Sequence, residues 1–312
     1  MQAAQDSIYY HHAQPGAVIR ITGEDAADYL QSQFSNDLKQ KDSCHEATPV
    51  TYGLLLNRKG KIQADLFVLQ LQPTTFLTVS YFCAGDDLLA RLEANIIADD
   101  VQLEDVSKQF SRWVLLGSGI YDWLASSLQV PVPEKQAIIH GAAFIWKGRH
   151  AIVPNLDLLV PAAAGTQCPT VLFPELSTAR EISFAELERY RIEAMIPAIP
   201  IDLGPDDLPQ EGKLEGDAVS FTKGCYLGQE VMARLKAIGS PQRSLFKVSG
   251  KQTVPALPQP LYAGNKQVGL LTSGYSGADG CTGLALLKKR ECAEGSALST
   301  QPDGPVEFTV VA

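Results

Sequence analysis

Alternation between apolar and polar positions divides most of the chain into short strands and amphipathic helices. Apolar residues recur every fourth position over 23–38, which predicts a helix directly after the strand-like run 17–22. The same reasoning predicts further strands at 49–56, 61–70, 75–81, 101–106, 112–116, 142–146 and 156–160, and further helices at 86–98, 120–128, 183–194 and 229–237. Helical and strand periods are mixed throughout this part, so we expect an α+β fold.

The pattern changes near residue 240. Short β runs at 245–249, 267–272, 282–287 and 306–311 alternate with Gly, Pro and Asn clusters, and no helical period is found. This texture predicts a small antiparallel barrel or sandwich. We therefore expect two domains, 1–240 and 241–312.

Composition and charge limit the class of protein. Of the 312 residues, 45% are hydrophobic and 20% are charged, which is typical of a soluble globular protein. The formal net charge of −9 argues against broad nucleic-acid binding, which needs a basic surface. The N-terminus has no signal-peptide pattern and no run of about 18 apolar residues occurs, so we expect a cytoplasmic protein that does not enter a membrane.

The main candidate for chemistry is the stretch Lys223-Gly224-Cys225-Tyr226-Leu227-Gly228-Gln229-Glu230. Two glycines mark a sharply turning backbone, and a thiol near a lysine and a helix start is a candidate for reactivity. The alternative is a buried packing cysteine, which is the commoner role for this residue type. The six cysteines of the chain show no CxxC pair and no metal-finger spacing, so we expect reduced thiols.

Carboxylates and cations elsewhere provide weaker candidates. A carboxylate accepts two parallel N–H bonds from a pterin-like ring, and Glu193 lies next to a proline that ends its helix. Arg191, two residues earlier, points to a different side of that helix. Asp65 follows a basic hairpin turn. The basic side chains of this turn either bind an anionic ligand or are simply solvated. We expect the adjacent His11 and His12 to be solvated rather than metal ligands.

A basic group follows the cysteine stretch in this acidic chain and consists of Arg234, Lys236, Arg243 and Lys247. These residues suit a polyanion, such as a polyglutamylated cofactor tail or RNA. A solvated helix face explains them equally well.

The cysteine stretch resembles the signature of the YgfZ family of folate-binding proteins, whose mitochondrial counterparts support iron–sulfur cluster maturation. Segments 20–38, 55–66, 191–197 and 209–211 resemble both this family and the related glycine-cleavage T-protein, and 268–274 resembles the C-terminal barrel of the T-protein. The resemblance implies an α+β folate-binding region of two interleaved subdomains followed by an antiparallel β-barrel.

The resemblance also implies roles for individual residues. Glu193 corresponds to the pterin-binding glutamate of the T-protein, and Asp65 to one member of a carboxylate pair whose other position is Ala64 here. Met195 replaces a glycine. Family members carry tryptophans around the folate, at positions that match Gly16 and Leu187 in this chain. The candidate cofactor-binding residues are Glu193, Asp65, Arg191 and Arg234.

Two functions follow from these expectations. The first is an accessory factor for iron–sulfur cluster assembly or repair that binds tetrahydrofolate, works with carrier or client proteins including tRNA-modifying enzymes, and acts without turnover through Cys225. That thiol would ligate iron together with a partner's thiols, or form a mixed disulfide. Lys223 would favour the thiolate, while Gly224 and Gly228 would let a partner approach. The second is a tetrahydrofolate-dependent aminomethyltransferase, which the loss of a carboxylate at Ala64 disfavours.

Overall fold

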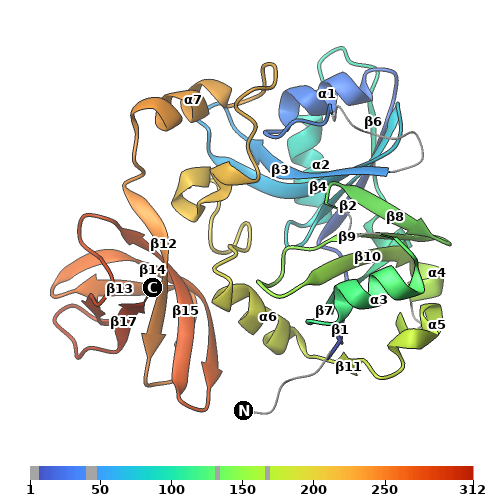
Figure 1. The fold of residues 1–312 in the computed structure, drawn as a ribbon. Helices are drawn as coiled ribbons and strands as arrows, with labels where there is room; N and C mark the ends of the chain where they lie inside the picture. Colours follow the sequence, from blue (N-terminus) through green and yellow to red (C-terminus); the bar gives the residue numbers. More distant parts are fainter. Residues whose placement is uncertain (1–6, 40–47, 131–133, 166–168, 312) are drawn as a thin grey trace.

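The computed structural model describes residues 7–39, 48–130, 134–165 and 169–311, and it contains two β-sheets with short helices around them (Figure 1). Eleven strands form one long sheet in the order β11-β1-β7-β10-β9-β8-β3-β4-β5-β2-β6. Their bounds are β1 Tyr9–Ala13, β2 Ala17–Thr22, β3 Thr48–Leu56, β4 Ile62–Gln72, β5 Thr75–Ser80, β6 Gln102–Asp105, β7 Phe110–Leu116, β8 Gln136–His140, β9 Ala143–Lys147, β10 Asn155–Pro161 and β11 Arg180–Glu181.

The chain passes twice between the two halves of this sheet. Strand β1 lies in one half, β2 to β6 form the other, and β7 to β11 return to the first. The halves meet where β3 pairs with β8 through Thr48–Ala137 and Pro49–Gln136, and where the Val50 amide donates to the Lys135 carbonyl at 2.9 Å. This arrangement confirms the two interleaved subdomains predicted from the resemblance.

Helices cover the sheet halves and bury their apolar sides on them. Helices α1 (Ala26–Gln33) and α2 (Gly85–Glu93) pack on β2, where Leu30 and Leu88 join Ile19 in one core. Helix α3 (Ile120–Ser127) packs on β7 and β10 with Trp123 against the second core. The short helices α4 (Ala162–Gly165) and α5 (Pro169–Leu172) follow β10. Each half thus has its own apolar core.

Helix α6 (Phe184–Glu193) and the segment after it connect the long sheet to the rest of the chain. A capping box opens α6, because the Ser183 hydroxyl accepts a hydrogen bond from the Glu186 amide and the Glu186 carboxylate accepts one from the Ser183 amide. The 3₁₀ helices η3 (Pro209–Gly212) and η4 (Leu214–Gly216) follow, and α7 (Gln229–Ile238) begins within the cysteine stretch.

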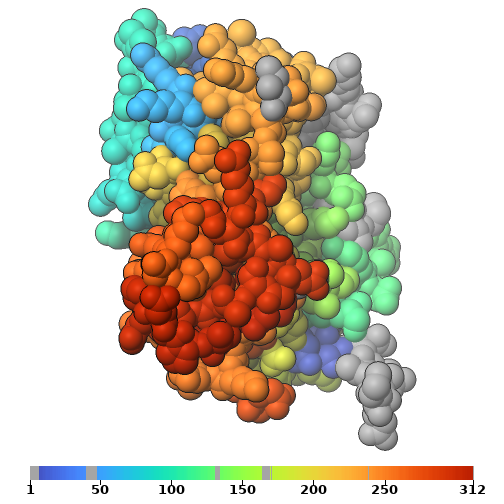
Figure 2. Space-filling model, turned by 90° about the vertical axis from the view of Figure 1, so that its left-hand side faces the viewer, coloured from blue at the N-terminus to red at the C-terminus, as the bar shows by residue number. Residues whose placement is uncertain are grey.

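The second sheet has six antiparallel strands in the order β13-β14-β15-β12-β17-β16. Their bounds are β12 Arg243–Gly250, β13 Gln259–Ala263, β14 Lys266–Gly277, β15 Gly280–Lys288, β16 Ala297–Leu298 and β17 Phe308–Val311. An isolated bridge between Tyr262 of β13 and Ser299, directly after β16, brings the two edge strands of this sheet together. The predicted barrel is therefore nearly closed. In Figure 2 the barrel faces the viewer below the α7 region.

One expectation about the N-terminus is wrong. His11 and His12 are partly buried within β1, because the His12 ring stacks on Trp113 at 4.1 Å and His11 Nδ1 lies 2.8 Å from the Ile182 carbonyl. Burial lowers the pKa of His12. Strand β1 itself escapes sequence reasoning because its sequence YYHHA does not alternate. Over the described ranges, no helix is long and apolar enough to cross a membrane.

Candidate functional site

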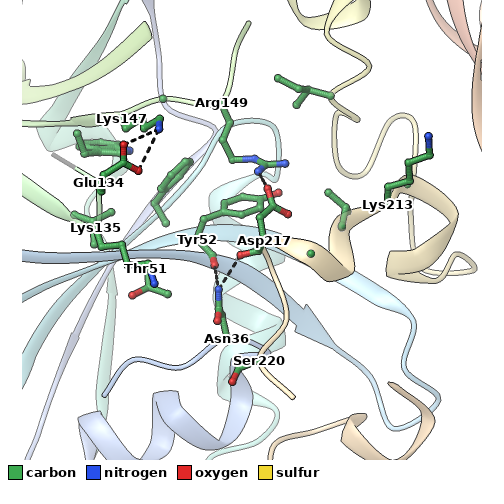
Figure 3. A pocket seen from close by; sticks show the side chains of 18 of the residues that line it. Asn36, Thr51, Tyr52, Glu134, Lys135, Lys147, Arg149, Lys213, Asp217 and Ser220 are labelled. Carbon is green, nitrogen blue, oxygen red and sulfur yellow. Dashed lines mark hydrogen bonds and ion pairs between the residues drawn. The ribbon is translucent and has the colours of Figure 1, made fainter. Parts of the chain in front are cut away.

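A cavity of about 1370 Å³ lies where the two sheet halves, the α6–η4 segment and the barrel meet (Figure 3). The barrel contributes Leu245 of β12, and the end of α6 contributes Met195. Small-molecule sites typically measure about 300–1,000 Å³. The cavity therefore has room for a cofactor and for part of a second molecule.

One wall of the cavity is aromatic. Tyr52 of β3, Phe67 of β4 and Trp146 of β9 line it, with ring centroids 5.1 Å apart for Tyr52 and Phe67 and 5.8 Å apart for Phe67 and Trp146. Trp146 is 1% exposed, and its Nε1 has no hydrogen-bond partner among the described residues. Such a wall suits a planar ring.

A polar network crosses the rim beside this wall (Figure 3). The Arg149 guanidinium lies 4.0 Å from the centre of the Tyr52 ring and pairs with Asp217. The side-chain Nδ2 of Asn36 donates to the Tyr52 backbone carbonyl at 2.8 Å and to the Asp217 backbone carbonyl at 2.9 Å. The network joins four chain segments that are distant in sequence, so folding is needed to assemble this rim.

Asp65 lies behind the aromatic wall. It is 6% exposed, and its Oδ2 accepts a hydrogen bond from the Tyr52 hydroxyl at 3.1 Å. Its Oδ1 has no partner within the described part of the chain. Burial raises the pKa of Asp65 to about 6, since a charged carboxylate is poorly solvated there. Ala64, the other position of the expected carboxylate pair, is buried in the opposite core.

Arg191 has no free donor for a ligand. Its Nε and Nη2 bond to the two oxygens of Glu188 at 2.8 and 2.7 Å, and Nη2 also donates to Ser273 at 2.9 Å. Its Nη1 donates to Asp202 and to the Ile196 carbonyl, both at 2.7 Å. These contacts use all five guanidinium N–H groups. Arg191, which is 2% exposed, therefore joins α6, the following segment and barrel strand β14.

Glu193 faces the barrel instead of the cavity wall. It accepts a hydrogen bond from the Tyr275 hydroxyl of β14, and Lys247 Nζ of β12 lies 3.5 Å away. Its side chain is 43% exposed, and the cavity lining begins only at the next residue, Ala194. The structure therefore does not bring Asp65 and Glu193 together on the cavity surface.

Gly16 and Leu187, where family members carry tryptophans, lie in tightly packed surroundings in this structure. A side chain at Gly16 would place its Cβ 2.7 Å from the Tyr81 carbonyl, and Leu187 is buried against Val114. Met195 has a φ of 54°, a left-handed conformation that favours the glycine of related chains. Trp146 supplies the aromatic wall from β9 instead, and no local sequence signal marks it.

The cysteine stretch forms a loop fixed to the body of the protein on both sides of the thiol. Lys223 is buried and donates to three carbonyls near the end of α1, and the Leu227 amide donates to the Ser32 carbonyl at 3.0 Å. Burial lowers the pKa of Lys223 to about 8. Gly228 has a φ of 85°, and a Cβ there would lie 2.7 Å from the Asn57 carbonyl. Tyr226 is buried in the core below the loop.

The thiol itself lies at the surface. Cys225 is exposed, and a Cβ placed on Gly224 would meet nothing within 4 Å. The loop starts at the cavity rim, which Ser220 and Thr222 line, but Cys225 is not a lining residue. Gln229 reaches back toward the carbonyls of Lys223 and Gly224 at 3.5 Å, and Glu230 is exposed.

The other cysteines in the described ranges are buried: Cys83, Cys281 and Cys292. Cys44 and Cys168 lie outside the described residues. Across those ranges, no three His, Cys, Asp or Glu side chains gather as a metal site would require. Cys225 is thus the exposed thiol of the described chain.

The basic residues after the loop do not form one free patch. Arg243 pairs with Asp207 at 2.8 Å and with Glu211 at 2.9 Å, while Lys247 faces Glu193. Lys236 lies 4.0 Å from the centre of the Phe221 ring. Arg234 is exposed on α7, away from the cavity lining.

Comparisons with known proteins place this geometry in a family. The family model for the GCVT N-terminal domain matches residues 11–138. The tRNA-modifying protein YgfZ of Sodalis glossinidius is 30% identical over 254 residues, which cover 77% of this chain and 70% of that protein. The chain belongs to the YgfZ family. The YgfZ protein of Serratia proteamaculans is 24% identical over 309 residues, covering 94% of this chain and 88% of its own.

The YgfZ-family chain is also similar to aminomethyltransferases. The enzyme of Staphylococcus carnosus is 26% identical over 284 residues, covering 86% of this chain and 75% of that protein. The crystal structure of the glycine cleavage system aminomethyltransferase T from Bartonella henselae superposes with a TM-score of 0.80 at 18% identity, over 98% of this chain and 85% of that one. This likeness confirms the predicted α+β fold with its C-terminal barrel.

Proposed function

We propose that this protein binds tetrahydrofolate in the cavity and supports the assembly or repair of iron–sulfur clusters through the thiol of Cys225. The observation that carries the proposal is the exposed Cys225 on a loop anchored at the cavity rim, in a described chain whose other cysteines are buried. A thiol that only filled the core would be covered as the others are.

The cavity has the features that a reduced pterin needs. The rings of Tyr52, Phe67 and Trp146 offer an aromatic wall for a planar ring. Asp65 carries an unpaired oxygen beside this wall, and it would accept an N–H group if the Tyr52 ring moved aside. Folate supplies a planar ring and an anionic tail; the protein's part is to orient the ring and exclude water. Glu193 would join the site only after release from Tyr275.

Two reactions of the Cys225 sulfur would serve this role. The sulfur can ligate one iron of a cluster that is cargo, with the remaining ligands supplied by the thiols of a carrier or client protein. Alternatively, the Cys225 thiolate attacks a partner's disulfide, forms a mixed disulfide and releases the partner's second sulfur as a thiolate. In both cases the exposed Gly224 leaves space for the partner's backbone.

The test uses a strain that lacks its own copy of the protein and reports on an iron–sulfur enzyme that methylthiolates tRNA. We expect Cys225→Ala to abolish rescue of that activity while leaving folding and tetrahydrofolate affinity unchanged. The buried Cys292→Ala is the matched control and should rescue. Full rescue by Cys225→Ala would end the thiol proposal, and no binding of tetrahydrofolate at millimolar concentration would end the folate proposal.

A second candidate function is aminomethyl transfer to tetrahydrofolate. The buried Asp65, whose pKa is raised, favours it because such a carboxyl holds a proton near neutral pH. The lack of a second carboxylate at Ala64 disfavours it. The decisive measurement is release of methylenetetrahydrofolate from an aminomethyl donor, and turnover lost in Asp65→Asn would establish the protein as an enzyme.

A further inference from the structure

We propose that Lys223 is a positioning residue: it fixes the Cys225 loop by capping the C-terminal end of α1, and it does not act on the thiol as an activating cation. This inference rests on the proposed role of Cys225. It concerns how the loop is held, whereas the closeness of Lys223 and Cys225 in the sequence suggests that the lysine activates the thiol.

The contacts of the Lys223 ammonium carry the inference. Its Nζ donates to the carbonyls of Gln31 at 2.7 Å, Phe34 at 2.7 Å and Asn36 at 2.8 Å. Helix α1 ends at Gln33, so the Gln31 carbonyl is one of its last four carbonyls, which lack helical partners. The Phe34 and Asn36 carbonyls belong to the segment that directly follows the helix. The negative end of the helix dipole adds to the attraction.

The ammonium has no donor left for the thiol. A lysine carries three N–H groups and no acceptor. Three carbonyls at 2.7–2.8 Å use all three of them, and the residue is only 8% exposed. A cation that activated Cys225 would direct at least one N–H group toward Sγ. The charge of Lys223 is instead compensated by the backbone of a segment nearly 190 residues earlier.

Neighbouring backbone bonds attach the same loop to the same place. The Ser220 amide donates to the Ser35 carbonyl at 2.9 Å, and the Leu227 amide donates to the Ser32 carbonyl at 3.0 Å. These bonds lie before and after Lys223, so the loop is tied to the end of α1 at three points. Between the last two ties, Gly224 and Cys225 project into open space.

The experiment compares wild type with Lys223→Met, which keeps the length of the side chain and removes the ammonium. Hydrogen exchange by mass spectrometry follows the amides of Ser220 and Leu227, and peptide mapping follows alkylation of Cys225 by iodoacetamide. We expect amide exchange at both sites to become at least tenfold faster, alkylation of Cys225 not to fall more than twofold, and rescue of the client enzyme to be lost. The exposed Lys251→Met of the barrel is the control and should change none of these.

Unchanged exchange at Ser220 and Leu227 overturns the capping role. A fall in the alkylation rate of more than twofold overturns the claim that Lys223 does not activate the thiol. If Lys223→Met does not fold, Lys223→Gln, which retains two donors, is measured by the same two criteria. Rescue by Cys225→Ala would remove the proposed thiol function, while the exchange and alkylation results would still decide how Lys223 holds the loop.

Discussion

Replacing Asp65 by Asn should make the protein more stable at alkaline pH relative to its stability at acidic pH. The raised pKa of Asp65 means that the fold prefers the neutral carboxyl. The contribution of Asp65 to the free energy of unfolding is therefore most favourable at low pH. It is lost as the pH rises from 3.8, the ordinary pKa of the carboxyl, through its folded-state pKa of about 6. An asparagine does not ionise, so it escapes this loss.

The size of the effect follows from the pKa shift. A rise from 3.8 to about 6 corresponds to about 3 kcal/mol of unfolding free energy once both the folded and the unfolded carboxyl are ionised. Part of this loss already occurs below pH 5, because the unfolded carboxyl ionises there. Proton linkage predicts that the remaining loss of unfolding free energy between pH 5 and pH 8 is about 1.4 kcal/mol. Any fixed cost of the amide next to the Tyr52 hydroxyl is the same at both pH values, so it cancels in the difference.

Urea unfolding of wild type and Asp65→Asn at pH 5 and pH 8 measures this difference. Of the three tryptophans, Trp146 of β9 packs on Phe67 of β4, two residues from Asp65, so tryptophan fluorescence reports unfolding around Asp65. We expect the unfolding free energy of Asp65→Asn, relative to that of wild type, to be about 1.4 kcal/mol higher at pH 8 than at pH 5. The exposed Asp279→Asn, in the turn between β14 and β15, should gain nothing. Equal gains in the two variants would refute the reasoning from burial.

Three further outcomes follow from the contacts. Gly228→Ala should lower the unfolding free energy by at least about 2 kcal/mol through its left-handed backbone and its clash, whereas Gly224→Ala should stay within about 0.5 kcal/mol in urea unfolding. Arg191→Met should lower the unfolding free energy by about 3–5 kcal/mol, because it leaves the buried carboxylate of Asp202 unpaired. The exposed Arg189→Met should lower it by less than about 1 kcal/mol. Similar losses in the two variants would contradict the ion-pair account. Glu193→Gln should weaken tetrahydrofolate binding about tenfold in calorimetry, and a change below twofold would remove Glu193 from the site.

Local signals in the sequence located most of the helices and strands. The capping box at Ser183 fixed the start of α6, and the hairpin between β3 and β4 followed from two apolar runs around a turn. Strands β1, β8, β11, β13 and β16 were not predicted, because they are short or polar and gain their stability from neighbours distant in sequence. The division at 240/241 stays a prediction.

The candidate site was only partly accessible from the sequence. The motif around Cys225 was visible because its residues are adjacent, but the purpose of Lys223 was not, because its partners belong to α1. Trp146 and Arg149 were missed for the same reason: they reach the cavity from β9 and the loop after it, and neither lies in a recognisable motif. Pairing of distant segments decides these roles, and single-sequence periodicity contains no information about it.

The short seam between β3 and β8 has a mechanical consequence for the cavity. Two residue pairs and the Val50–Lys135 bond connect the sheet halves there, and residues on both sides of the seam, including Thr51 and Gln136, line the cavity. A molecule that fills the cavity therefore contacts both halves at once and links them across this seam. Occupancy should stiffen this joint, so that the amides of β8 and of the start of β3 exchange more slowly in the complex than in the free protein.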